Sequence, residues 1–197
     1  ANFPLLLPKA EEIGDSRATE FITAIDSLIC EMEPVVRQFA VEVEEHYRLP
    51  GFESDVMSSK DSWTYRYLYY PPGSRPTLAN AHGDRGGFTF HLAETEEGGE
   101  YLDFDNVWRP WPVSTKRTII FPGMVLQHRS RCTLKTLWHR VVPTEQSIQH
   151  GRVSMVAFID FKSSHRFDDS RFRMQNFEPG ELYSMPFEEL DRFFVPT

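Results

Sequence analysis

The sequence predicts a mainly β protein with flanking helices, in which a long amphipathic helix precedes an antiparallel barrel or jelly roll. Two patterns support this fold class. Apolar residues recur at steps of three and four up to about residue 50, as they do along one face of a helix. From about residue 61, short runs of aromatic and β-branched residues alternate with Pro, Gly and Asn, which is typical of strands and turns. Because no helical periodicity separates these runs, a parallel α/β sheet is excluded.

Residues 1–60 are predicted to form an arm and the long helix. The first 14 residues are expected to be irregular, because Pro4, Pro8 and Gly14 interrupt them. Asp15 or Ser16 can cap the helix, which is expected to end before Pro50. Its buried face is predicted to contain Phe21, Ile25, Leu28, Met32, Val35, Phe39 and Val43. Cys30 is predicted to be a small core residue on the apolar side of this helix.

Residues 61–162 are predicted to form the jelly-roll core, from strand-like runs such as WTYRYLYY, GFTFHLAE, RTIIFPG, TLWHRVVP and RVSMVAFIDF. The acidic run ETEEGGEYLDFD (Glu94–Asp105) lacks the ligand spacing of a calcium loop, so a solvated hairpin is expected. Residues 163–197 mix charged residues with Phe and are predicted to form a helix or lid over the barrel. Together the three parts are predicted to make one domain, 1–197.

Composition narrows the classes of partner. The net charge of −8 argues against nucleic acid or an anionic membrane surface as a main partner. The sequence contains neither an apolar run long enough to span a bilayer nor an N-terminal secretory signal. Two distant cysteines do not form a disulfide scaffold, which favours a reducing, cytoplasmic setting. A small-molecule substrate is therefore expected, and the oligomeric state stays open.

His82 and Asp84 are candidate metal ligands. They lie two residues apart, so on a strand their side chains share one face. Such a pair is also expected by chance in a chain with seven His and 29 acidic residues, so a third ligand is needed. His139, in the strand-like run LWHRVV, supplies one. Two histidines and one carboxylate form the facial triad that binds Fe(II) and leaves positions open, whereas a structural zinc site is closed by a fourth protein ligand.

Arg152 and Ser154 are candidate anion-binding residues. They also lie two residues apart, in the run RVSMVAFI, and are expected to share one face of a strand. A guanidinium group beside a hydroxyl suits a carboxylate, which it can bind by charge-assisted hydrogen bonds. If this strand neighbours the strand of His139, a small diacid can chelate the metal at one end and contact Arg152 at the other.

These motifs resemble those of the 2-oxoglutarate and Fe(II)-dependent oxygenases, in particular the group of isopenicillin N synthase and the plant flavonoid and hormone dioxygenases. The resemblance runs along most of residues 17–161. It rests on YRYLYYPPGS, AHGDRGGFTFHL, VWRPWPV, IIFPGMVLQHRS, LWHRVV and RVSMVAFI, which occur in the family's order. The resemblance implies a double-stranded β-helix (jelly roll) core.

The resemblance also implies roles for individual residues. His82, Asp84 and His139 are expected to bind Fe(II), and Gly86-Gly87 to form the bend before the next strand. Arg152, Ser154 and Tyr70 are expected to bind the cosubstrate 2-oxoglutarate, which reacts with O2. The implied reaction couples oxidative decarboxylation of 2-oxoglutarate to hydroxylation, desaturation or cyclisation of a small organic substrate.

The sequence departs from the family pattern in three places. Leu68 replaces an Asn near the cosubstrate, and Met124 replaces an Asp of the segment that precedes the third ligand. The chain is also shorter than family members usually are at the N-terminus, which leaves pocket closure open. Two alternative functions remain open: a 2-oxoglutarate-independent iron oxidase of the isopenicillin N synthase type, and a non-catalytic jelly-roll binding module.

Overall fold

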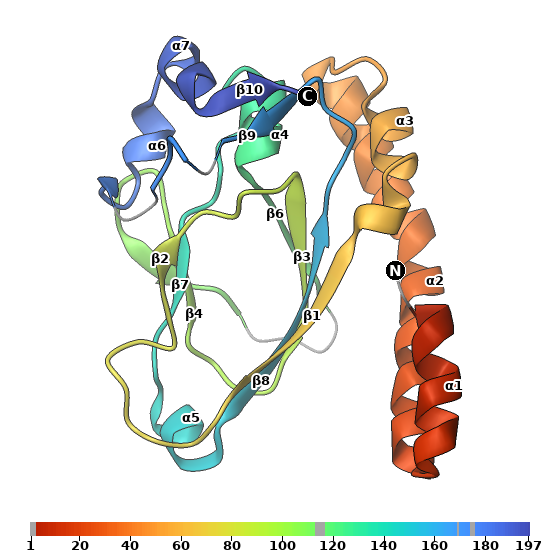
Figure 1. Ribbon diagram of the computed structural model, residues 1–197. Coiled ribbons are helices and arrows are strands. Elements are labelled where there is room, and N and C mark those ends of the chain that lie inside the picture. Colours follow the sequence, from red (N-terminus) through yellow and green to blue (C-terminus); the bar gives the residue numbers. More distant parts are fainter. Residues whose placement is uncertain (1–2, 113–116, 169, 174–175) are drawn as a thin grey trace. The chain divides into compact units, whose positions relative to one another are not determined.

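The computed structural model describes residues 3–112, 117–168, 170–173 and 176–197 (Figure 1). The chain divides into two compact units, residues 1–62 and residues 63–197. Within the described ranges, no helix combines the length and the apolar character that crossing a membrane requires. Val113, the last residue of the VWRPWPV motif, lies outside these ranges. The single-domain division expected from the sequence stays a prediction.

The first unit is helical, and its first helix corrects an expectation. It contains α1 (Phe3–Ile13), α2 (Ser16–Tyr47), α3 (Phe52–Met57) and the 3-10 helix η1 (Lys60–Ser62). The prediction of an irregular arm was wrong, because α1 occupies most of that stretch. Pro4 is tolerated because it lies in the first turn, where the backbone N–H has no partner within the helix. Gly14 adopts a φ of 72° and ends the helix as a left-handed cap.

The long helix α2 is confirmed, but its buried face is rotated from the predicted one. Asp15 is the N-cap, and its side chain accepts a hydrogen bond from the backbone N–H of Arg17. The buried residues are Ile25, Met32, Val36, Ala40 and Val43. Phe21 and Val35 are exposed, and so is Cys30, so the prediction of Cys30 as a core residue was wrong. The small Ala40 is compatible with close packing, and a stripe chosen for large residues missed it.

The second unit contains the predicted jelly roll as two antiparallel four-stranded sheets (Figure 1). One sheet has the order β1 (Thr64–Tyr70), β8 (Arg152–Ile159), β3 (Phe88–Glu94) and β6 (Ile119–Pro122). The other has the order β2 (Ala79–His82), β7 (His139–Val141), β4 (Gly99–Leu102) and β5 (Trp108–Pro110). Neighbours within each sheet are mostly distant in sequence, as in a double-stranded β-helix, which confirms the predicted fold class.

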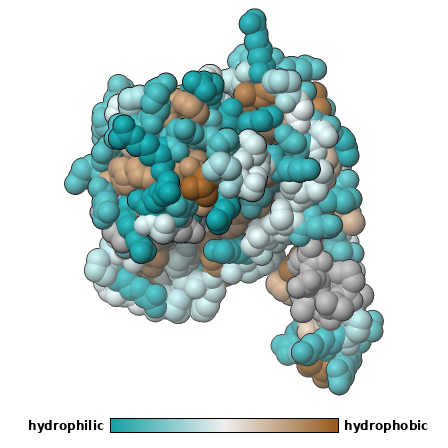
Figure 2. All heavy atoms as spheres, turned by 45° about the horizontal axis from the view of Figure 1, so that its top comes forward, coloured by the Kyte–Doolittle hydropathy of each residue, from teal (hydrophilic) through white to brown (hydrophobic). Residues whose placement is uncertain are grey.

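Short helices and a small sheet complete this unit. They are α4 (Met124–Arg129), α5 (Glu145–His150), α6 (Glu181–Ser184), α7 (Phe187–Leu190), η3 (Asp191–Phe193), and the paired strands β9 (His165–Phe167) and β10 (Phe194–Pro196). In Figure 1, α5 lies at one end of the unit, whereas α4, α6, α7, β9 and β10 gather at the other. Figure 2 shows hydrophilic residues over most of the face of this unit that it presents, with hydrophobic residues in separate spots.

The C-terminal residues share a buried apolar cluster with the jelly roll. The cluster consists of Leu102, Met124, Trp138, Phe172, Leu182, Met185, Leu190 and Phe194. Tyr183 fixes the segment further, because its hydroxyl accepts a hydrogen bond from the Trp138 N–H and donates one to the Leu102 carbonyl, both at 2.9 Å. Met124, a departure from the family pattern, is fully buried here. A role of residues 163–197 as a pocket cover stays a prediction.

Candidate active site

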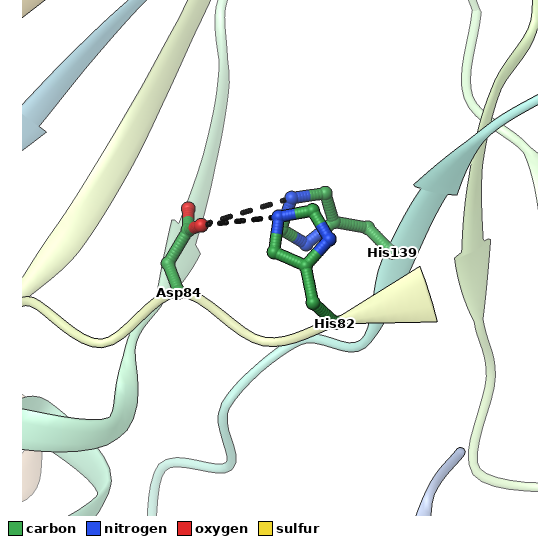
Figure 3. Close-up of side chains that lie close together, drawn as sticks. All are labelled: His82, Asp84 and His139. Atoms are coloured by element: carbon green, nitrogen blue, oxygen red, sulfur yellow. Dashed lines mark ion pairs between the residues drawn. The ribbon is translucent and has the colours of Figure 1, made fainter. Parts of the chain in front are cut away.

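His82, Asp84 and His139 converge in the jelly roll (Figure 3). His82 is the last residue of β2 and is the cross-strand partner of His139, the first residue of β7. Asp84 lies in the loop after β2, with Oδ1 3.7 Å from His82 Nε2 and 3.8 Å from His139 Nε2. One donor atom from each residue lies within 4.8 Å of the others, so a single ion can contact all three.

Backbone carbonyls orient both imidazole rings. His82 Nδ1 lies 2.7 Å from the Asn80 carbonyl oxygen, and His139 Nδ1 lies 3.1 Å from that of Leu137. A carbonyl only accepts hydrogen bonds, so each Nδ1 carries the proton and each Nε2 keeps its lone pair for a metal. Burial lowers the pKa of His139 to about 4 against the opposing charge of Asp84, so this ring is neutral near neutral pH.

Thr89 orients the carboxylate. Its hydroxyl donates a hydrogen bond to Asp84 Oδ2, so the other oxygen, Oδ1, faces the two histidines. Thr89 is buried on β3, whereas the three candidate ligands lie on β2, in the loop after β2 and on β7. Sequence reasoning did not single it out, although Thr is part of the strand that resembled the family. The outcome is a carboxylate that offers one oxygen to the site.

The loop that contains Asp84 needs glycine because backbone and side chains approach it closely. A Cβ on Gly86 would lie 2.6 Å from Asp160 Oδ1, and one on Gly87 would lie 2.6 Å from the Ile159 carbonyl oxygen. On the other side, the Met124 N–H at the start of α4 donates to the Asp84 carbonyl at 2.8 Å. The loop is therefore fixed from both sides, as the predicted bend at Gly86-Gly87 requires.

All six site residues singled out from the sequence line one cavity of about 160 Å³: Tyr70, His82, Asp84, His139, Arg152 and Ser154. β1 and β8 pair antiparallel, which makes Tyr70 the cross-strand partner of Arg152 and Leu68 that of Ser154. Burial raises the pKa of Tyr70 against the nearby charge of Arg152, so its hydroxyl keeps its proton. The cavity thus joins a metal-binding triad to a cationic end.

The Arg152 guanidinium is fully buried and only partly satisfied. Nε donates to the Glu96 carbonyl at 3.1 Å, and Nη2 donates to the Glu94 carboxylate. Nη1 finds no hydrogen-bond partner in the described part of the chain. A buried cationic N–H without a partner is costly, so this nitrogen is suited to a carboxylate ligand in the cavity.

Glu94 was expected in a solvated hairpin, and this was wrong: its side chain is only 3% exposed. Its carboxylate accepts hydrogen bonds from Arg152, from His91 at 3.2 Å and from the Trp111 indole at 3.0 Å. Burial alone would raise the pKa of Glu94, but the His91 hydrogen bond and the Arg152 charge outweigh burial, so the pKa lies below its ordinary value. Residue spacing did not indicate this, because β3 has a bulge between His91 and Ala93 that changes which residues face inward.

A second cavity of about 490 Å³ adjoins the first. The two share four lining residues: Arg66, His82, Asp84 and Phe158. Arg85 and Asp160 also line the second cavity. The candidate metal ligands His82 and Asp84 therefore lie where the two cavities meet, so a molecule in either one can reach the same ion.

The family follows from comparison with known proteins. Residues 63–161 match the sequence model of the 2OG-Fe(II) oxygenase superfamily, where 2OG is 2-oxoglutarate. The chain belongs to this superfamily. The matched range contains the three residues of the facial triad, and the match confirms the resemblance to the 2-oxoglutarate and Fe(II)-dependent oxygenases that the motifs indicated. A search of curated protein sequences finds no match.

Solved structures support the fold of this oxygenase. JOX2 in complex with 2OG, Fe and JA superposes with a TM-score of 0.67 and 19% identity, over 91% of this chain and 58% of that one. Rice dioxygenase for auxin oxidation superposes with a TM-score of 0.65 and 19% identity, over 90% of this chain and 65% of that one. A full-length Neurospora crassa protein in complex with alpha-KG superposes with a TM-score of 0.66 and 17% identity, over 89% of this chain and 58% of that one. The chain thus spans less than two thirds of the length of each of these structures.

The residues present fit the family's cofactors, Fe(II) and 2-oxoglutarate. Two imidazoles and one carboxylate are the donor set of non-haem iron oxygenases, and neither cysteine lines the cavity to favour zinc. Arg152 lines the same cavity, and its guanidinium, with Nη1 unpartnered in the described ranges, suits the second carboxylate of a small diacid. The chain therefore contains both a candidate iron-binding triad and a cationic residue for 2-oxoglutarate, as the family name implies.

Proposed function

We propose that this chain is an iron-dependent oxygenase that couples oxidative decarboxylation of 2-oxoglutarate to oxidation of a small organic substrate. Hydroxylation is the simplest outcome, and desaturation and cyclisation are chemically related. The observation that supports this most is that the triad lines the same cavity as Arg152, whose Nη1 has no hydrogen-bond partner among the described residues. A non-catalytic binding module would have no need for both.

In this proposal, His82, Asp84 and His139 hold Fe(II) through Nε2, Oδ1 and Nε2. Arg152 and Ser154 bind the carboxylate of 2-oxoglutarate that lies farther from the metal, and Tyr70 contributes its hydroxyl. Arg152 supplies the charge through Nη1 and Ser154 a neutral hydrogen bond. Leu68 leaves this end of the cavity with one polar group fewer than the family pattern.

Bound Fe(II), 2-oxoglutarate and O2 together supply an oxidant for unactivated C–H bonds. The chain's own task is to position the reactants and to exclude water. Trp111, Phe121 and Val156 give the cavity apolar walls. Thr89 keeps Asp84 Oδ2 occupied by a hydrogen bond, so Oδ1 would be the oxygen that holds the metal.

We propose that the organic substrate occupies the second cavity. It adjoins the metal ligands His82 and Asp84 and has room for more than the cosubstrate. Arg66 and Arg85 line it together with Asp84 and Asp160; with Asp84 committed to the metal, the two arginines outnumber the remaining carboxylate and favour a substrate with an anionic group. The JOX2 structure is a complex that contains JA, and the rice enzyme is named for auxin oxidation, but at 19% identity these structures indicate only the fold. Since both cysteines are free thiols, a reducing, cytoplasmic setting suits this protein.

A second candidate is an iron oxidase that does not use 2-oxoglutarate. The ion pair between Arg152 and Glu94 favours it, because a guanidinium already matched by a carboxylate has less need of a diacid. The two candidates differ in one product: the 2-oxoglutarate-dependent enzyme forms succinate, and the oxidase does not.

The proposal is tested by incubating the protein with Fe(II), 2-oxoglutarate and air in the presence of a library of small organic acids, and measuring succinate. We expect slow succinate formation with no library compound and faster formation with a substrate. The His139→Ala variant is the control for free iron in solution. Substrate oxidation without succinate would instead establish the 2-oxoglutarate-independent oxidase, and no reaction with any compound would favour the binding module.

A further inference from the structure

The contact between Glu94 and Arg152 bears on how tightly a diacid can bind in the cavity. A guanidinium group presents two pairs of parallel N–H donors, Nη1 with Nη2 and Nε with Nη2. Both pairs include Nη2, which donates to Glu94, while Nε already donates to the Glu96 carbonyl. Nη1 has no hydrogen-bond partner in the described part of the chain, so a ligand carboxylate that binds either pair must share Nη2 with Glu94.

Glu94 is placed for this contact by the surrounding fold. The bulge in β3 pairs Glu94 with Ser154 of β8, and Ser154 is one of the residues that line the cavity. The Trp111 indole reaches Glu94 because Gly99 leaves room for it: a Cβ on Gly99 would lie 2.0 Å from the ring. His91 adds a third donor. The carboxylate is therefore built into the cavity wall.

We propose that Glu94 is a built-in competitor that sets the affinity of the cavity for 2-oxoglutarate. The inference rests on the proposed function. With Glu94 ionised, Arg152 is already paired, so an incoming dicarboxylate adds a second negative charge beside one guanidinium. Glu94 thereby weakens the binding of dicarboxylates, and it does not act on ligands that lack the second carboxylate.

The decisive variant is Glu94→Gln, which keeps the shape and an oxygen that can accept from Trp111 but removes the charge. In anaerobic titrations of the Fe(II)-loaded protein, we expect 2-oxoglutarate to bind at least about tenfold more tightly to this variant than to wild type, which corresponds to about 1.4 kcal/mol. Pyruvate, a 2-oxo acid with one carboxylate, is expected to bind both proteins equally. Glu100→Gln is the matched control, because Glu100 pairs with Arg140 and does not line the cavity.

The outcomes separate this inference from the proposed function. Equal or weaker binding of 2-oxoglutarate to Glu94→Gln overturns the inference and leaves the proposed function standing. A gain shared by pyruvate also overturns it, because the effect is then not on the second carboxylate. If only Glu94→Gln binds 2-oxoglutarate, the inference is supported, and Glu94 prevents binding in wild type. If neither protein binds 2-oxoglutarate, both the inference and the proposed function are wrong.

A second variant covers the case in which Glu94→Gln does not fold. Glu94→Asp keeps the buried charge but shortens the side chain by one methylene, which withdraws the carboxylate from Nη2. We expect a smaller gain in 2-oxoglutarate affinity, again absent for pyruvate. An unchanged or reduced affinity in this variant contradicts the proposed competition.

Discussion

The hydroxyl of Thr89 donates a hydrogen bond to Oδ2 of Asp84, and Oδ1 of the same carboxylate faces His82 and His139. One strand, β3, thus determines which oxygen of a loop residue is free for the metal. Groups that orient a ligand in this way affect metal affinity although they do not touch the ion.

Thr89→Val tests this relationship, because valine keeps the branched shape but removes the hydroxyl. We expect Fe(II) affinity to fall by about tenfold to a hundredfold, the usual effect of losing a group that orients a metal ligand. Anaerobic equilibrium dialysis measures it. Thr133→Val, at an exposed position, is the control and should leave the affinity unchanged. Wild-type affinity in Thr89→Val would show that Asp84 is oriented by other means.

His139→Ala should abolish both Fe(II) binding and turnover while the jelly roll stays folded, because His139 lies at the start of a short strand and outside the apolar cluster. Circular dichroism checks the fold, and metal analysis checks the iron content. The control is His150→Ala, which removes an exposed histidine at the end of α5. Turnover at the wild-type rate in His139→Ala would refute the triad.

His128 should make the larger unit less stable in mild acid. Burial lowers the pKa of His128 below its ordinary value of 6.5, although Asp191 opposes this shift through a 2.8 Å hydrogen bond. The unfolded chain therefore binds a proton near pH 6.5, whereas the folded chain binds it only at lower pH. As pH falls below 6.5, the contribution of the neutral ring is lost.

The free energy of unfolding, measured in urea at pH 7.5 and pH 5.5, checks this expectation. Wild type should lose more stability between the two values than His128→Gln, which cannot be protonated. An equal loss in both proteins would remove His128 as a source of the pH dependence. Because other groups titrate in both proteins, only the difference between them is informative.

Tyr183→Phe should destabilise the C-terminal part without disturbing the metal site. The change removes two hydrogen bonds, from the Trp138 N–H and to the Leu102 carbonyl, with an expected cost of about 1–3 kcal/mol. Tyr69→Phe, at an exposed position, is the control for the loss of a hydroxyl. An unchanged urea midpoint in Tyr183→Phe would show that these hydrogen bonds contribute nothing to stability.

The ratio of succinate to oxidised product in the same variant also tests whether the C-terminal segment covers the pocket.

The sequence predicted the parts of the site that depend on local spacing. His82 and Asp84 share a face because of two-residue spacing, and Arg152 and Ser154 do so for the same reason. The third ligand, His139, was found by its strand-like run and by the resemblance. All of these line one cavity because the jelly roll brings β1, β2, β7 and β8 together.

Other features depend on contacts that spacing does not encode. Because of the bulge in β3, the Glu94 side chain is buried, although its acidic neighbours in the sequence suggested a solvated hairpin. Cys30 was assigned to the core from its position near an apolar stripe, but the buried face of α2 contains Val36 and Ala40 instead. Pro4 and Pro8 suggested an irregular arm, but Pro4 lies in the first turn of α1, where a helix tolerates proline, and α1 also continues through Pro8.

The central claim is that 2-oxoglutarate binds at a metal ion held by the triad, with Arg152 at its far end. The most direct measurement is anaerobic titration of the Fe(II) protein with 2-oxoglutarate, which follows the visible charge-transfer band that chelation produces. We expect saturable growth of the band in wild type and in Arg140→Met, and no band in His139→Ala. In Arg152→Met the affinity should fall about a hundredfold, since a charged hydrogen bond contributes about 1.5–3 kcal/mol and the buried charge is also lost. Equal affinity in Arg152→Met and wild type, or no band in any of these proteins, would contradict the account.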